Sequence, residues 1–219
     1  AALTGEAGAD ANWLSQVTIV ANAQAAVNGN IFASDVMFTG DGRLTIEHGF
    51  NISNNVTPGE EGAGTLVSLG NNTISGDAGL AGETPVSLFA VYGGAGEGEG
   101  AFTTSFSNSV FAQTVYVTGQ GMIEIAGDLL GDVVFQENGT FRMTGDDAIM
   151  MGSISTENDL DGIVRFNSSV TLTGNIGASG LAIGEVYAGD DLYAQLDQFY
   201  AGTVTTCGAG CRVDLSPGE

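Results

Sequence analysis

Short bursts of alternating apolar and polar residues, most of them ended by glycine, run through the chain and restrict its fold more than any other feature. Val36 and Phe38 lie on one side of such a burst, and Leu44 and Ile46 on one side of the next. A period of two residues is typical of a β-strand with one buried side. The same alternation recurs at Phe141 and Met143, at Val164 and Phe166, and at Val170 and Leu172. The bursts last about five residues, a usual strand length, and end at Gly, Asn-Gly or Asp-Gly, which favour tight turns. The sequence therefore predicts an all-β protein of many short strands.

One segment of this pattern occurs more than once. Residues 31–46 read IFASDVMFTGDGRLTI, and residues 110–125 read VFAQTVYVTGQGMIEI, with seven of the sixteen positions identical. A weaker third copy begins at Phe199 and keeps Thr203 and Val204 in register with Thr114 and Val115. A repeat interval of this length is too long for one turn of a solenoid and fits a block of several turns.

Two architectures satisfy this pattern. In a parallel β-solenoid (β-helix), each short strand ends at a glycine corner and stacks on the next turn about 4.8 Å away. In an antiparallel β-sandwich or jelly roll, the segments TGDGR and ENGTF would be hairpin turns. We predict the solenoid, as a single elongated domain over residues 1–219. Its repeat copies begin near residues 31, 110 and 199, and the glycine-rich residues 93–100 are a candidate seam.

The charge balance limits the partners of such a protein. The chain has 26 acidic residues against four Arg and no Lys, so its net charge is −22. Nucleic-acid binding is disfavoured, because it needs Lys and Arg to displace counterions from phosphate. Anionic membrane surfaces are disfavoured for the same reason. No apolar run approaches the roughly 20 residues of a transmembrane helix, so we expect no membrane insertion by this chain.

One segment departs from the strand pattern. In residues 190–200, DDLYAQLDQFY, Leu192, Leu196 and Phe199 fall at helical spacing after two aspartates that could cap a helix. The sequence predicts a helix there. Trp13 is the lone tryptophan of the chain, and we expect it to cover the core near the amino end.

Residues 163–186 resemble the repeat units of rickettsial outer-membrane surface antigens and related autotransporter passengers. Those units contain phrases of the form V-x-F-N-x-x-V-T-x-T-G-N-I-G. The matching residues here are Val164, Phe166, Asn167, Val170, Thr171, Thr173, Gly174, Asn175, Ile176 and Gly177. The resemblance implies an exported β-helical passenger displayed on a cell surface, working in adhesion or as a structural coat. It carries over no catalytic residue.

Acidic residues in predicted turns are candidate metal ligands. Asp146 and Asp147 are adjacent, and Asp159 and Asp161 lie in the segment NDLDG. Carboxylate and carbonyl oxygens in loops are typical Ca²⁺ ligands. Ca²⁺ is therefore the candidate cofactor, although NDLDG lacks the twelve-residue frame of an EF-hand.

Two covalent modifications are suggested by the sequence. Cys207 and Cys211, in CGAGC, would form a small local disulfide in an exported protein, and a reduced or intermolecular pair is the alternative. The N-x-S/T pattern marks five candidate glycosylation sites. They are Asn51, Asn55, Asn71, Asn138 and Asn167.

No enzyme signature is present in the sequence. A Ser-His-Asp triad would have to use His48, the one histidine, and there is no G-x-S-x-G partner. A glycoside hydrolase needs two carboxylates that face one groove, and no acidic pair occurs in such a setting. We therefore expect a protein that is not an enzyme, with a polysaccharide-cleaving β-helix as the least favoured alternative.

The leading hypothesis is a secreted structural protein that assembles with copies of itself into an extracellular filament, sheath or surface layer. Strand-rich repeats offer open edges that recruit identical units through main-chain hydrogen bonds. The predicted assembly strand is Gln16, Val17, Thr18, Ile19 and Val20. The second hypothesis is a cell-surface adhesin, a monomeric rod that binds a host surface or a glycan.

Overall fold

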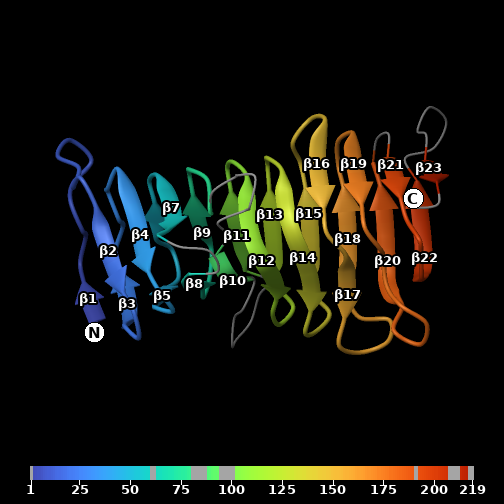
Figure 1. Ribbon diagram of the computed structural model, residues 1–219, viewed down its shortest axis with the longest axis horizontal. Helices are drawn as coiled ribbons and strands as arrows, with labels where there is room; N and C mark the ends of the chain where they lie inside the picture. The colour runs from blue at the N-terminus through green and yellow to red at the C-terminus, as the bar shows by residue number, and fades with distance from the viewer. Residues whose placement is uncertain are drawn as a thin grey trace.

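The chain forms a parallel β-solenoid (Figure 1). The computed structural model describes residues 2–59, 63–79, 88–93, 102–189, 192–206 and 213–216. Within these ranges every regular element is a β-strand, and every pair of named strands is parallel, as in β13–β15 and β18–β20. The predicted solenoid is confirmed, and the antiparallel alternative is wrong. Its two proposed hairpin turns, at residues 40–42 and 138–139, are corners between strands on different faces.

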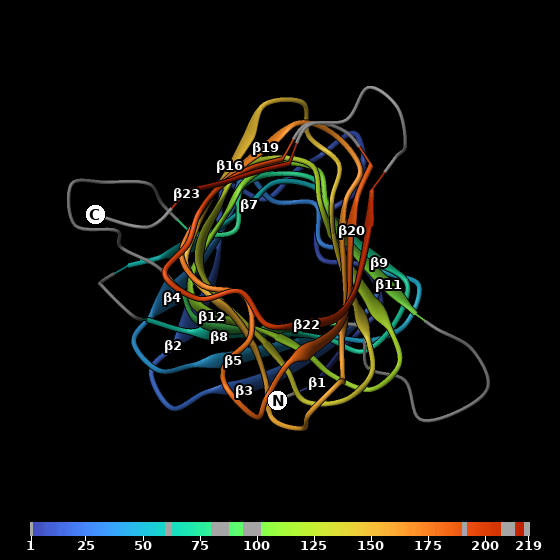
Figure 2. The same ribbon diagram turned by 90° about the vertical axis from the view of Figure 1, so that its right-hand side faces the viewer.

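The strands lie on three faces around a common axis (Figure 2). Face 1 holds β2 (Val17–Val20), β4 (Asp35–Thr39), β7 (Asn55–Pro58), β16 (Ala148–Met151), β19 (Val170–Thr173), β21 (Leu192–Gln195) and β23 (Val213–Ser216). Face 2 holds β1 (Ala2–Thr4), β3 (Gln24–Asn28), β5 (Arg43–Ile46), β8 (Thr65–Ser68), β10 (Leu88–Gly93) and β17 (Ile154–Thr156). Face 3 holds β6 (Asn51–Ile52), β9 (Asn72–Ile74), β11 (Thr103–Phe106), β13 (Met122–Ile125), β15 (Thr140–Met143), β18 (Ile163–Phe166), β20 (Ile183–Ala188) and β22 (Ala201–Thr206). Two longer strands, β12 (Val110–Val117) and β14 (Leu129–Phe135), bend from face 1 onto face 2.

The repeated segment does not stack on itself. Val36 belongs to face 1, where it pairs with Val56. Its counterpart Val115 belongs to face 2, and Val204, from the third copy, belongs to face 3. Each copy has therefore moved on by one face, so the repeat interval is not the block of whole turns that the sequence predicted. The same sequence pattern suits all three faces, because each face needs apolar residues pointing inward at every second position and then a corner.

The core is a set of apolar ladders inside the tube. On face 3, the stacked residues Ile123, Phe141, Val164 and Val186 are at most 1% exposed. Five phenylalanines are fully buried in the same interior: Phe38, Phe106, Phe135, Phe141 and Phe166. Burial of each such side chain contributes about 1.5–3 kcal/mol to folding. The alternation read from the sequence therefore identified the inward residues correctly.

Glycine is required at the corner between faces 1 and 2. Gly131, Gly152 and Gly174 stack there with φ of 144°, 148° and 142°. A Cβ on Gly152 would lie 2.2 Å from the carbonyl oxygen of Gly131, and one on Gly174 would lie 2.2 Å from that of Gly152. Only a residue without a side chain permits successive backbones to approach this closely.

The helix predicted over residues 190–200 is wrong. Leu192–Gln195 form β21, which pairs with β19 in parallel register. Leu192 and Ala194 point into the core, and Tyr193 is 42% exposed. The stack of strands on face 1 overrides the local helical spacing, because a strand here continues the hydrogen bonding of β19 and a helix would not. Asp190 and Asp191, the predicted caps, lie outside the described residues.

Candidate functional sites: the solenoid ends and a polar pocket

Polar side chains at the corners tie successive rungs together, where a rung is one circuit of the three faces. Asp132 Oδ1 accepts the backbone N–H of Ser153 at 2.8 Å, and Ser153 Oγ accepts that of Asn175 at 3.1 Å. Asn175 Oδ1 then accepts the N–H groups of Asp197 and Gln198, at 3.1 and 2.9 Å. A second corner uses Asn55, Asp77, Ser109 and Asp128 in the same manner. These Asn, Asp and Ser side chains satisfy backbone donors that the corners leave unpaired.

Most of the candidate glycosylation asparagines belong to this corner system. The side-chain oxygens of Asn51, Asn55 and Asn71 accept backbone N–H groups of the next rung, from Thr73, Asp77 and Thr103. Asn138 accepts the N–H of Gly162 at 3.3 Å. Asn167 is exposed and makes no side-chain hydrogen bond within the described residues. Glycosylation stays a prediction, and Asn167 is the site where it would disturb the fewest contacts.

The predicted metal ligands lie in two separate places. Asp146 and Asp147 follow β15, whereas Asp159 and Asp161 precede β18. Because β15 and β18 are parallel neighbours, the two pairs lie at opposite edges of face 3. Asp159 Oδ1 accepts the N–H of Ala182 at 2.8 Å, and Asp161 Oδ2 accepts an amide hydrogen from Asn158 at 3.1 Å. Among the residues that the structure describes, no three His, Cys, Asp or Glu side chains gather at one place. Ca²⁺ binding stays a prediction that each pair would have to support separately.

Other predicted features fall at corners or outside the described ranges. His48 lies in a turn, where its Nδ1 accepts the backbone N–H of Asn71 at 3.2 Å. Trp13 is 43% exposed, its indole N–H is donated to the carbonyl of Asp10, and it is not among the partly buried side chains that pack against the core, so the expectation that it covers the core is wrong. Cys207, Cys211 and residues 94–100 of the candidate seam lie outside the described residues.

Within the described residues, the outermost strands of the solenoid have unpaired edges. At one end, β1 pairs with β3 and β2 with β4, and no described strand lies beyond them. At the other end, β22 pairs with β20 and β23 with β21, with no further strand beyond them in the described part of the chain. Val204 of β22 stacks on Val186. It is 50% exposed, whereas Val186 is 1% exposed. The interior apolar ladder of face 3 therefore reaches solvent at this end.

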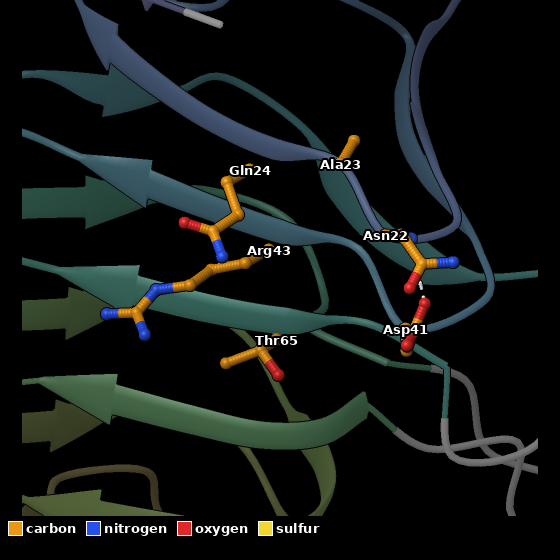
Figure 3. A pocket seen from close by; sticks show the side chains of 6 residues that line it. All are labelled: Asn22, Ala23, Gln24, Asp41, Arg43 and Thr65. Atoms are coloured by element: carbon orange, nitrogen blue, oxygen red, sulfur yellow. Dashed lines mark hydrogen bonds between the residues drawn. The ribbon is translucent and has the colours of Figure 1, made fainter.

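A polar pocket of about 310 Å³ opens on the outer side of face 2 near its corner with face 1. Gln24, Arg43 and Thr65 line it from three neighbouring strands, in direct register with one another. Figure 3 shows Arg43 between Gln24 and Thr65, with Asn22 and Asp41 at one end of the pocket. Asp41 Oδ1 accepts the backbone N–H of Asn22 at 2.8 Å, and Asn22 has a left-handed backbone with φ of 60°.

Arg43 differs from the other arginines that the structure describes. Arg142 forms an ion pair with Glu124 on the neighbouring strand. The guanidinium of Arg165 lies over the ring of Tyr187, 5.6 Å from its centroid. Arg43 is exposed and has no carboxylate or aromatic partner among the described residues. Sequence reasoning missed this pocket, although the repeat gave a signal: the position of Arg43 is occupied by Met122 in the second copy.

Comparison with known proteins adds no further information about these sites. No family model, no curated protein and no solved structure matches the chain. A separate property concerns membranes: the described residues contain no helix of the length and apolarity needed to span a bilayer.

Proposed function

We propose that this protein is a non-catalytic structural protein that assembles head to tail with copies of itself into an extracellular filament, sheath or surface layer. The observation that carries the proposal is the open apolar ladder at β22. Val204 continues a stack whose inner members are fully buried, and a further rung would bury it. A second copy can supply that rung. The extracellular location is proposed from the resemblance of residues 163–186 to exported passengers.

The directions of the strands are compatible with such stacking. All strands at both ends run parallel to their neighbours. A copy placed end on can therefore add its β2 to β23 on face 1, and its segment at Ala7, which bridges Ile31 on face 3, to β22, with the strand direction and spacing that the rungs already use. Main-chain hydrogen bonds at the open edges would supply the affinity, as in β-strand addition generally. A head-to-tail contact that does not close produces a fibre.

Charge also favours contact at the ends. The net charge of −22 opposes close approach of two copies over most of their surface. Of the four strands at the ends, β1 (ALT), β2 (VTIV) and β22 (AGTVTT) contain no charged residue, and β23 (VDLS) contains one, Asp214. In the predicted assembly strand, Ile19 is 6% exposed against its own core, whereas Val20 is 57% exposed. Thr18 and Val20 are therefore the exposed side chains of this strand.

A matched pair of substitutions tests this proposal. Val204→Asp places a charge on the open end, and Met151→Asp places one on the outer side of face 1 at nearly the same exposure, 50% against 51%. We expect the wild-type protein and Met151→Asp to form linear assemblies as concentration rises, measured by analytical ultracentrifugation and negative-stain microscopy. Val204→Asp should remain monomeric, because assembly would bury its unpaired carboxylate.

Three outcomes would contradict the proposal. Isolated wild-type rods at every concentration would favour the adhesin hypothesis. Unchanged assembly of Val204→Asp would show that the contact lies elsewhere on the molecule. Saturable cleavage of a polysaccharide in an activity screen, lost on unfolding, would favour an enzyme.

A further inference from the structure

We propose that the pocket around Arg43 binds a carboxylated sugar, such as one uronic acid unit of an acidic polysaccharide. This site is separate from the proposed contact at Val204, because it lies on the outer side of face 2 near the amino-terminal end, where two of its residues, Asn22 and Ala23, follow the terminal strand β2. Its six lining residues are Asn22, Ala23, Gln24, Asp41, Arg43 and Thr65.

The guanidinium of Arg43 indicates that the ligand carries an anionic group. It forms no ion pair with any carboxylate among the described residues. Arginine presents paired N–H donors that match the two oxygens of a carboxylate. An organic carboxylate fits better than a phosphate, because Asp41 and the net charge of −22 penalise each additional negative charge on the ligand.

The other lining groups fit hydroxyl groups. Gln24 and Thr65 lie one strand to either side of Arg43, so their polar ends lie roughly 4.8 Å to each side along the sheet. The side chain of Asn22 adds an amide group. Asp41 Oδ1 already accepts a hydrogen bond from the backbone N–H of Asn22, so Asp41 Oδ2 remains as the acceptor for the ligand. No aromatic ring lines the pocket among the described residues, so a flat apolar ligand gains little there. Its volume is at the low end for ligand pockets, which suits a single sugar ring.

Two matched sugars and two matched variants test this inference. D-Glucuronate and D-glucose differ only in the group on C5, a carboxylate against a hydroxymethyl. Their binding can be followed by ligand-observed saturation-transfer NMR, which works for monomers and polymers alike. We expect saturable binding of glucuronate, at least about tenfold weaker binding of glucose, and a similar loss for glucuronate with Arg43→Gln. Arg165→Gln, which removes a cation from face 3, should leave the affinity unchanged.

Each remaining outcome overturns the inference. Equal affinities for glucose and glucuronate would mean that Arg43 does not bind the carboxylate. Unchanged binding by Arg43→Gln, or loss with Arg165→Gln, would place the sugar elsewhere. Acetate that competes with glucuronate at equal concentration would mean that the hydroxyl groups contribute nothing and that the site is not a sugar site.

Discussion

The stacked glycines at the corner between faces 1 and 2 show how single residues permit this fold. Each of Gly131, Gly152 and Gly174 has a positive φ and lies against the backbone of the preceding rung. The spacing of the strands leaves no room for a Cβ at these points. The residue that follows each glycine is Asp132, Ser153 or Asn175, and it supplies the hydrogen-bond acceptor for the next rung. At each corner, the glycine therefore allows the backbones of two rungs to approach closely, and the next residue accepts a hydrogen bond from a backbone N–H of the following rung.

Replacing Gly152 by alanine should destabilise the protein strongly. The new Cβ would lie 2.2 Å from the carbonyl oxygen of Gly131 and 2.5 Å from its carbon, both of them backbone atoms that cannot move independently. We expect a loss of about 2–4 kcal/mol in the free energy of unfolding, measured by urea denaturation. Gly180→Ala is the control, since Gly180 has φ of 81° with nothing within 4 Å of its Cβ position. It should cost only the left-handed backbone strain of about 1 kcal/mol. Equal losses in the two variants would contradict the steric argument.

At the scale of elements, the corner side chains hold neighbouring rungs in register. Asn175 joins β19 to the segment after β21, because its side-chain oxygen accepts two backbone N–H groups, from Asp197 and Gln198. A third ladder of this kind connects Asn30 to Asn51 and Asn51 to Thr73. The register of the strands is therefore fixed by specific acceptors at the corners as well as by the inward apolar residues.

Replacing Asn175 by alanine should loosen the last rungs locally. The amides of Asp197 and Gln198 would lose their acceptor, which costs about 1–2 kcal/mol. We expect their hydrogen exchange to accelerate by about 5- to 30-fold, while the amides of β13 and β15 keep their rates. Asn167→Ala is the matched control, because the Asn167 side chain is exposed and has no hydrogen bond among the described residues. Exchange that accelerates equally in both variants, or throughout the chain, would argue against a local tie.

At the scale of the whole molecule, the net charge of −22 is distributed along a thin tube. Strands of successive rungs lie about 4.8 Å apart, so their outward carboxylates are close together. The repulsion between these carboxylates lowers the stability of the folded state. Only one ion pair, between Glu124 and Arg142, is found among the described residues. Stability should therefore depend on the ions in solution.

Raising NaCl from about 10 mM to about 0.5 M should increase the melting temperature by several degrees, because the screening length falls from about 30 Å to about 4 Å. The double variant Asp146→Asn, Asp147→Asn should show a smaller increase, since it removes two exposed carboxylates.

Ca²⁺ at the same ionic strength tests the predicted metal ligands. Stabilisation beyond the NaCl effect, lost in the double variant, would support a site at Asp146 and Asp147. A melting temperature that does not respond to salt would contradict the repulsion argument.

The sequence by itself determined most of the strands and the inward residues, and it favoured the solenoid over the antiparallel sandwich without deciding between them. Alternation of apolar residues is local, so Val36, Phe38, Phe141 and Met143 could be assigned to the core without knowledge of their neighbours. Glycine at the ends of the bursts likewise indicated corners, because the φ it permits is a property of the residue itself.

The tertiary structure alone decided which strand stacks on which. Rungs vary in length, from 18 residues between Val115 and Val133 to 32 between Asn72 and Thr104, so the repeat interval could not reveal that its copies fall on different faces. The same stacking made residues 192–195 a strand and placed Arg43 between Gln24 and Thr65. These contacts join residues about 20 positions apart through hydrogen bonds between rungs. A local sequence pattern does not specify which strand of the next rung it will pair with.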